Sequence, residues 1–246
     1  MKKLVLIFCL IGLVFSSGIL SADPTFTGPT GIATQPSAEI AGDSNLIISA
    51  DGYFTKNKGT GKDTSYHIRA LYGIGNVFEV GLGYIGGNND TITIHGKYSS
   101  PIETFGFNWA FGAIYSDARP PRTDLRVTQL YTAGTKLFED TRAGAPQLKA
   151  TIGLNFTEFT GGFITGKESM FRYYAAGELF FDNGISAGFD VQSTNSSILQ
   201  EGEPLWGFIL RYPVNDKWKA HIGYTNWDNF KSADEGNAFI GADYSF

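Results

Sequence analysis

The chain is poor in cysteine, methionine and histidine: its 246 residues include one cysteine, two methionines and three histidines. The cysteine, Cys9, lies in the apolar stretch from Leu4 to Phe15, so we expect neither a disulfide nor a zinc-thiolate site in the rest of the chain. Metal-binding spacings such as HxxxH are also missing from the sequence. We therefore expect no metal and no other cofactor.

Positive charge is scarce as well. The chain has 19 Lys and Arg against 24 Asp and Glu, a formal net charge of -5. Removal of residues 1–22 would take away two lysines and leave -7. Nucleic-acid partners call for a basic surface, so this balance argues against one.

Long apolar runs are limited to the N-terminus. Two lysines at positions 2 and 3 precede the apolar stretch, and small residues follow around Ser21 and Ala22, which is typical of a secretory signal peptide over residues 1–22. A membrane anchor is the weaker interpretation, because a spanning helix needs about 20 apolar residues. A lipoprotein signal is also disfavoured, because bulky Phe8 precedes Cys9. The absence of a second such run excludes an inner-membrane helix bundle.

Glycine and aromatic residues are abundant, with 31 Gly, 20 Phe, 12 Tyr and 4 Trp. After a Pro/Gly/Thr-rich segment at 23–44, apolar residues alternate with polar ones in stretches separated by turn signals, which predicts an all-β fold of about twelve antiparallel strands, with ten or fourteen as alternatives. The expected strands are 45–54, 65–75, 77–85, 91–99, 105–115, 125–137, 147–157, 170–181, 185–192, 205–213, 217–226 and 237–246.

The connections between these stretches alternate in length. Short turns such as Gly75-Asn76 and VNDK alternate with longer polar loops such as TKNKGTGKDT and STNSSILQEGEP. This arrangement is typical of transmembrane β-barrels, with short periplasmic turns and longer extracellular loops. A soluble barrel with its apolar face inward is the alternative.

The two faces of the expected strands differ in charge. One face is apolar, as in Phe78, Val80, Leu82 and Tyr84, and is expected to meet lipid. The opposite face is expected to line the lumen. Its charged residues are Arg69, Glu79, Lys97, Arg126, Lys136, Lys149, Arg172, Glu178, Asp190, Arg211, Lys219 and Asp243, and its histidines are His67, His95 and His221. Eight bases against four carboxylates would focus anions in an open lumen; alternatively, these charges pair and stiffen a closed interior.

The last nine residues, AFIGADYSF, alternate to the final aromatic residue. This stretch resembles the C-terminal assembly signal of bacterial outer-membrane proteins, through Gly241, Tyr244 and Phe246. The resemblance implies recognition by the barrel-assembly machinery and a place in outer-membrane lipid. Phe239 departs from the pattern, because a polar residue is usual there.

The segment from residue 28 to residue 54 carries a second resemblance. Gly28, Thr30, Gly31, Pro36 and Ala38 match the opening of YjbH-like outer-membrane proteins. That resemblance implies kinship with proteins linked to exopolysaccharide production, and it covers under 30 residues of common types.

These observations lead to a division into a signal peptide (1–22), an N-terminal periplasmic or lumen segment (23–44) and an outer-membrane barrel (45–246). We expect a monomeric, narrow, passive pore for small anionic solutes. The alternative is a non-conducting accessory barrel in surface polysaccharide export or envelope assembly. An outer-membrane lipid-modifying enzyme is a third interpretation, disfavoured because no local motif places a nucleophile beside a histidine.

Overall fold

The computed structural model describes residues 23–25, 28–57, 61–87, 90–119, 124–138, 145–161, 167–193, 204–226 and 236–246. The expected signal peptide at 1–22 lies outside the described residues. Within the described part of the chain, no helix is long and apolar enough to cross a lipid bilayer.

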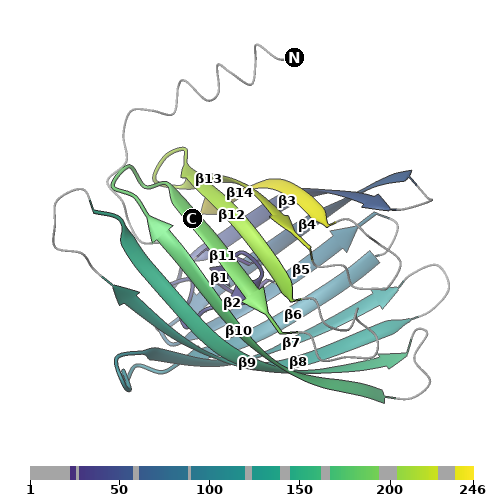
Figure 1. Ribbon diagram of the computed structural model, residues 1–246, viewed down its shortest axis with the longest axis horizontal. Coiled ribbons are helices and arrows are strands. Elements are labelled where there is room, and N and C mark those ends of the chain that lie inside the picture. The colour runs from purple at the N-terminus through teal and green to yellow at the C-terminus, as the bar shows by residue number, and fades with distance from the viewer. Residues whose placement is uncertain are drawn as a thin grey trace, which may run out of the picture.

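Twelve antiparallel strands close into one barrel, confirming the expected fold (Figure 1). Each strand pairs with the next along the chain, and β14 pairs with β3 to close the ring. The barrel strands are β3 (Leu46–Asn57), β4 (Gly61–Ile74), β5 (Phe78–Gly86), β6 (Asp90–Ser99), β7 (Asn108–Arg119), β8 (Leu125–Phe138), β9 (Gln147–Gly161), β10 (Lys167–Phe180), β11 (Ser186–Gln192), β12 (Leu205–Pro213), β13 (Trp218–Thr225) and β14 (Asn237–Ser245).

The start of β7 differs from the sequence-based expectation of residue 105. Phe105 and Gly106 have φ angles of 57° and 76°, and Thr104 and Phe107 form an isolated bridge across them. These left-handed φ angles form a turn and are incompatible with an extended strand. Alternating Phe105 and Phe107 imitate a strand in the sequence, yet Phe105 is 92% exposed and β7 begins only at Asn108.

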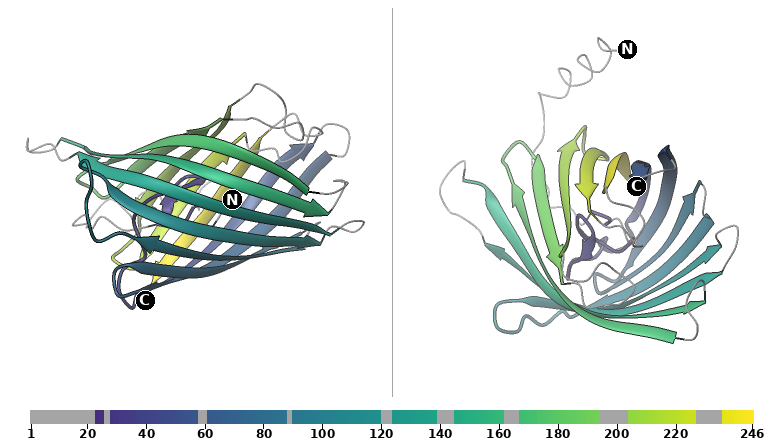
Figure 2. Two further views of the ribbon diagram at one scale, coloured as in Figure 1. Left: turned by 90° about the horizontal axis from the view of Figure 1, so that it is seen from below. Right: turned by 45° about the vertical axis from the view of Figure 1, so that its right-hand side comes forward.

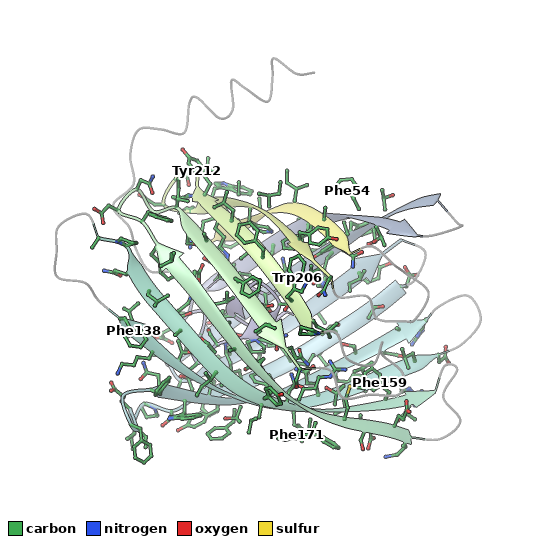
Figure 3. All side chains as sticks on the ribbon, in the orientation of Figure 1. Phe54, Phe138, Phe159, Phe171, Trp206 and Tyr212 are labelled. Atoms are coloured by element: carbon green, nitrogen blue, oxygen red, sulfur yellow. The ribbon has the colours of Figure 1, made fainter. Side chains whose placement is uncertain are left out.

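The outer surface of the barrel is apolar. Large side chains that alternate along each strand are about half exposed, among them Leu82 at 55% and Ile152 at 48%. Phe54, Phe138 and Phe171 project from the outer surface in Figure 3. An outward apolar band of this kind is what lipid requires of a transmembrane barrel.

We call the end of the barrel at which β3 begins and β14 ends the terminal end. Aromatic side chains gather there. Trp218 packs against Tyr244, with 4.7 Å between the ring centroids, and Tyr244 meets Phe246 edge-on at 4.6 Å. Two of the expected assembly-signal residues thus contribute to this ring of aromatics. Such a girdle is typical of the boundary between lipid tails and headgroups.

We call residues 23–44 the plug; of these, 23–25 and 28–38 are buried inside the barrel, whereas Asp43 and Ser44 are exposed at its end. The short strands β1 (Gly31–Ile32) and β2 (Gln35–Pro36) form a hairpin in the lumen, drawn in purple within the ring of strands (Figure 2). Ile32 is fully buried in a cluster with the inward-facing Tyr53, Ile209 and Phe239. At the terminal end the chain passes into β3, where the Ser44 amide donates to the Gly73 carbonyl at 3.0 Å.

Candidate functional site

Most of the expected lumen residues lie on the inner wall. These residues are buried, except the half-buried Lys219: His67, Arg69, Glu79, His95, Lys97, Lys149, Arg172, Glu178, Asp190, Arg211, Lys219, His221 and Asp243. The inner wall therefore carries many charges, and the plug covers a large part of them.

Arg126 and Lys136 lie on the outer face instead. Lys136 and Phe138 are two residues apart on β8 and therefore point to the same face. Phe138 pairs with Leu148 of β9. Phe138 and Leu148 are both exposed large hydrophobic side chains, and the Lys136 ammonium lies 5.2 Å from the Phe138 ring centroid. Both charges stand near the ends of β8, where a long side chain can reach the headgroup layer. The sequence pattern misplaced them because β8 carries small and polar residues on both faces.

The expected excess of positive charge in the lumen is therefore wrong. Without Arg126 and Lys136 six bases remain on the inner wall. Two further carboxylates join the four expected ones: Asp51 is buried on β3, and Glu168 pairs in register with the inward Phe159. The described wall is balanced at six bases and six carboxylates, and the plug adds more carboxylates.

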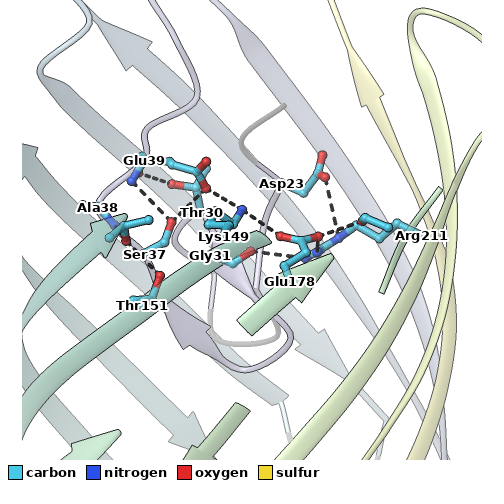
Figure 4. Close-up of polar contacts among 12 residues, drawn as sticks. Asp23, Thr30, Gly31, Ser37, Ala38, Glu39, Lys149, Thr151, Glu178 and Arg211 are labelled. Atoms are coloured by element: carbon cyan, nitrogen blue, oxygen red, sulfur yellow. Dashed lines mark hydrogen bonds and ion pairs between the residues drawn. The ribbon is translucent and has the colours of Figure 1, made fainter. Parts of the chain in front are cut away.

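Lys149, Arg211 and Lys219 form a basic cluster on one side of the lumen. Within the wall, Glu178 lies 2.7 Å from Lys149 and 2.5 Å from Arg211. The plug supplies two further carboxylates, which Figure 4 shows among these residues. Glu39 lies 2.7 Å from the Lys149 ammonium. Asp23 lies 2.7 Å from Lys219 and 3.7 Å from the Arg211 guanidinium.

A second network lies across β3, β4, β13 and β14. The carboxylate of Asp51 contacts both Arg69 and His221, and His221 also lies 3.1 Å from Asp243. Arg69 donates to the backbone oxygen of plug residue Thr25. Gly241, the third expected assembly-signal residue, makes room for this network, because a Cβ atom there would lie 2.2 Å from the Asp51 carboxylate.

Glu79 joins the plug to β5 and β6. Its two carboxylate oxygens accept the amides of Thr30 and Ala41, each at 3.0 Å. Lys97 lies 3.4 Å from the same carboxylate and donates to the Thr30 carbonyl at 3.1 Å. The expected lumen charges therefore hold the plug as well as one another.

The tip of the plug hairpin is held by Asp190 of β11. Its carboxylate accepts the Thr34 amide at 2.6 Å, the Thr34 hydroxyl at 2.7 Å and the Gln35 amide at 3.1 Å. Tyr174 donates its hydroxyl to the Pro36 carbonyl at 3.0 Å. Sequence reasoning missed Asp51 and these contacts; glycines on the inner face of β11 and β12 were the available signal. A Cβ atom on Gly188 would lie 2.8 Å from Ile32.

Two of the three histidines contact carboxylates. Both ring nitrogens of His221 face carboxylates, and Ser49 donates to Asp243 rather than to a histidine. His95 lies 3.3 Å from Glu79. Within the described ranges, no group of three or more His, Cys, Asp or Glu side chains has the arrangement of a metal site.

Known structures share this architecture at low sequence identity. An outer membrane channel from Pseudomonas putida F1 superposes with a TM-score of 0.57 and 11% identity, covering 87% of this chain and 100% of that one. The KdgM porin gives 0.55 and 9% identity over 81% of this chain and 99% of that one, and the NanC porin gives 0.53 and 10% over 80% and 98%.

No family model matches the chain, and no curated protein matches its sequence. The similarity to the three solved structures therefore rests on the barrel as a whole. The chain has the fold of bacterial outer-membrane β-barrel proteins.

Proposed function

We propose that the chain is a narrow passive pore of the bacterial outer membrane for small anionic solutes, closed here by its own plug. A closed ring of twelve strands with an apolar exterior and a charged interior supports a lumen built for polar solutes. A barrel of this size is intermediate between filled eight-stranded barrels and open sixteen-stranded porins, so an inserted segment decides whether it conducts.

The basic cluster carries this proposal. Asp23 and Glu39 of the plug place carboxylates on Lys219, Arg211 and Lys149. When the plug leaves, Glu178 is the one carboxylate of the described wall that remains paired with this cluster, and it contacts Lys149 and Arg211 but not Lys219. The plug carboxylates thus occupy positions that an anionic solute would take, and their departure leaves a locally positive path although the whole wall is balanced.

The test is single-channel conductance in planar bilayers under a salt gradient, with the refolded barrel either retaining or lacking residues 23–44. We expect few openings with the plug and frequent, anion-preferring openings without it. In the barrel that lacks residues 23–44, the double variant Lys149→Gln, Lys219→Gln is expected to move the reversal potential toward zero. Arg126→Gln serves as the matched control and is expected to leave it unchanged.

The outcomes separate the interpretations. Cation preference in the plug-free barrel would overturn the anionic assignment. A correctly folded barrel that stays silent in both forms would replace the pore by the accessory, non-conducting role in polysaccharide export or envelope assembly.

A further inference from the structure

Among the described residues, five buried polar side chains on the inner wall of β8 to β11 each carry one atom that has no hydrogen-bond partner. None of them belongs to the basic cluster or to the plug. The unpartnered atoms are the Tyr131 hydroxyl, Asn155 Oδ1, Thr157 Oγ1, Arg172 Nε and Gln192 Nε2. Buried polar groups are almost always paired with protein or water, so five in one region call for an explanation.

These five residues are contiguous on the sheet. Tyr131 pairs in register with Asn155, and Asn155 pairs with Arg172. Thr157 follows Asn155 on the same face of β9, and Gln192 pairs with Tyr174, which follows Arg172 on the same face of β10. We call these five residues the Arg172 patch.

Arg172 differs from the other five bases on the inner wall. Each of those lies within 4.0 Å of a carboxylate. Among the described residues, no carboxylate lies that close to Arg172, whose guanidinium contacts the neutral sulfur of Met170. A buried charge without a counter-ion is strongly unfavourable, so this guanidinium is expected to take an anion.

The unpartnered atoms are mainly hydrogen-bond donors. Arg172 Nε and Gln192 Nε2 can only donate, the hydroxyls of Tyr131 and Thr157 can donate, and Asn155 Oδ1 alone can only accept. An excess of donors beside a cation suits a carboxylate, whose oxygens accept several hydrogen bonds.

Apolar side chains border the Arg172 patch on one side, and the plug borders it on another. Met170 and Leu205 form a buried cluster with the partly buried Phe159 beside it. On the side of the plug, Gln192 accepts a hydrogen bond from Gln35 at 2.8 Å. The patch therefore lies immediately beyond the hairpin tip, away from the terminal end of the barrel.

We propose that the Arg172 patch binds a small organic monocarboxylate. The carboxylate pairs with Arg172 and accepts from Tyr131 or Thr157, and the apolar body of the ligand lies against Met170 and Leu205. This site is separate from the basic cluster, and its occupancy does not require the barrel to conduct.

Binding of 4-fluorobenzoate to the full refolded protein tests this site, followed by 19F NMR line broadening in detergent micelles. The neutral isostere 4-fluorobenzyl alcohol corrects for partition into micelles, and trifluoroacetate represents an anion without an apolar ring. We expect saturable binding of 4-fluorobenzoate, weakened about tenfold or more by Arg172→Gln and partly retained by Arg172→Lys. Arg119→Gln, at an exposed ion pair with Asp117 on the outer face, is the matched control and is expected to bind as the wild type does.

Equal binding by the wild type and Arg172→Gln, or no saturable binding by the wild type, would overturn the proposal. Equal affinity for trifluoroacetate would overturn the role given to the apolar body of the ligand and leave a site for the carboxylate group alone. Heat-modifiable migration of each variant on gels verifies that the barrel has folded. Because binding is measured on the closed barrel, a failure here is distinguishable from a failure of conductance.

Discussion

Gly207 of β12 lies directly against Ala33 of the plug: a Cβ atom on Gly207 would stand 3.4 Å from the Ala33 Cβ. That spacing is close to the separation of about 3.5–4.5 Å between Cβ atoms in disulfides. The same Cβ would lie 2.9 Å from the Thr34 methyl group, which Thr34→Ser removes, and 3.0 Å from Asp190 Oδ1, which must move by a few tenths of an ångström. The plug can therefore be fastened covalently to the wall.

The first prediction concerns this fastening. In the variant Ala33→Cys, Thr34→Ser, Gly207→Cys, we expect the oxidised barrel to show no openings in planar bilayers, because the plug cannot leave. Reduction with dithiothreitol is expected to restore the openings. Ala33→Cys with Thr34→Ser alone is the control and is expected to ignore the reductant. Equal, non-zero conductance of the oxidised and reduced forms would show that ions pass beside the plug.

The second prediction concerns Asp190. Asp190→Ala leaves the amides of Thr34 and Gln35 without their acceptor, and each buried unsatisfied donor costs about 1–3 kcal/mol. We expect amide exchange at these two residues to accelerate by about a hundredfold, since each 1.4 kcal/mol is a factor of ten. Asp117→Ala on the outer face is the control. Unchanged exchange in Asp190→Ala would mean that Asp190 does not hold the hairpin.

The third prediction compares two glycines. A Cβ atom on Gly73 would lie 1.7 Å from the Gly42 carbonyl oxygen, where the plug leaves the lumen, whereas one on Gly96 meets nothing within 4 Å. We expect Gly73→Ala to lower the urea midpoint of unfolding or to displace the plug, at a cost of about 1–3 kcal/mol for overpacking. Gly96→Ala is expected to be near neutral. Equal midpoints and equal protease resistance of the plug in both variants would contradict this packing.

The fourth prediction tests the lipid-facing surface. Ile152 is 48% exposed on the outer face near the middle of β9, so Ile152→Arg is expected to destabilise the barrel in lipid vesicles by about 2–4 kcal/mol. Phe138→Arg, at the end of β8, is expected to cost about 0–1 kcal/mol because the side chain reaches the interface. Equal costs at the two positions would argue against a bilayer around the barrel.

The strand pattern could be predicted because alternation is a local property. Successive side chains along a strand point to opposite faces, so the faces of residues such as Leu82 and Glu79 can be assigned before any partner strand is known. Twelve strands and most inward-facing charges followed from this rule. It failed at Phe105, where left-handed backbone breaks a strand-like pattern, and along β8, where Arg126 and Lys136 have few apolar neighbours to reveal the face.

The sequence alone thus predicted a barrel of about twelve strands and most of the segregation of lipid-facing from inward residues, because both depend on short-range periodicity, whereas closure of the ring excluded ten or fourteen strands. Tertiary structure decided whether the lumen is filled and which charges meet. The pairing of Glu39 with Lys149, which are 110 residues apart, and the lone charge of Arg172 depend on closure of the ring and entry of the plug. Contacts across a closed lumen join residues that no local pattern relates, and therefore only the folded barrel reveals them.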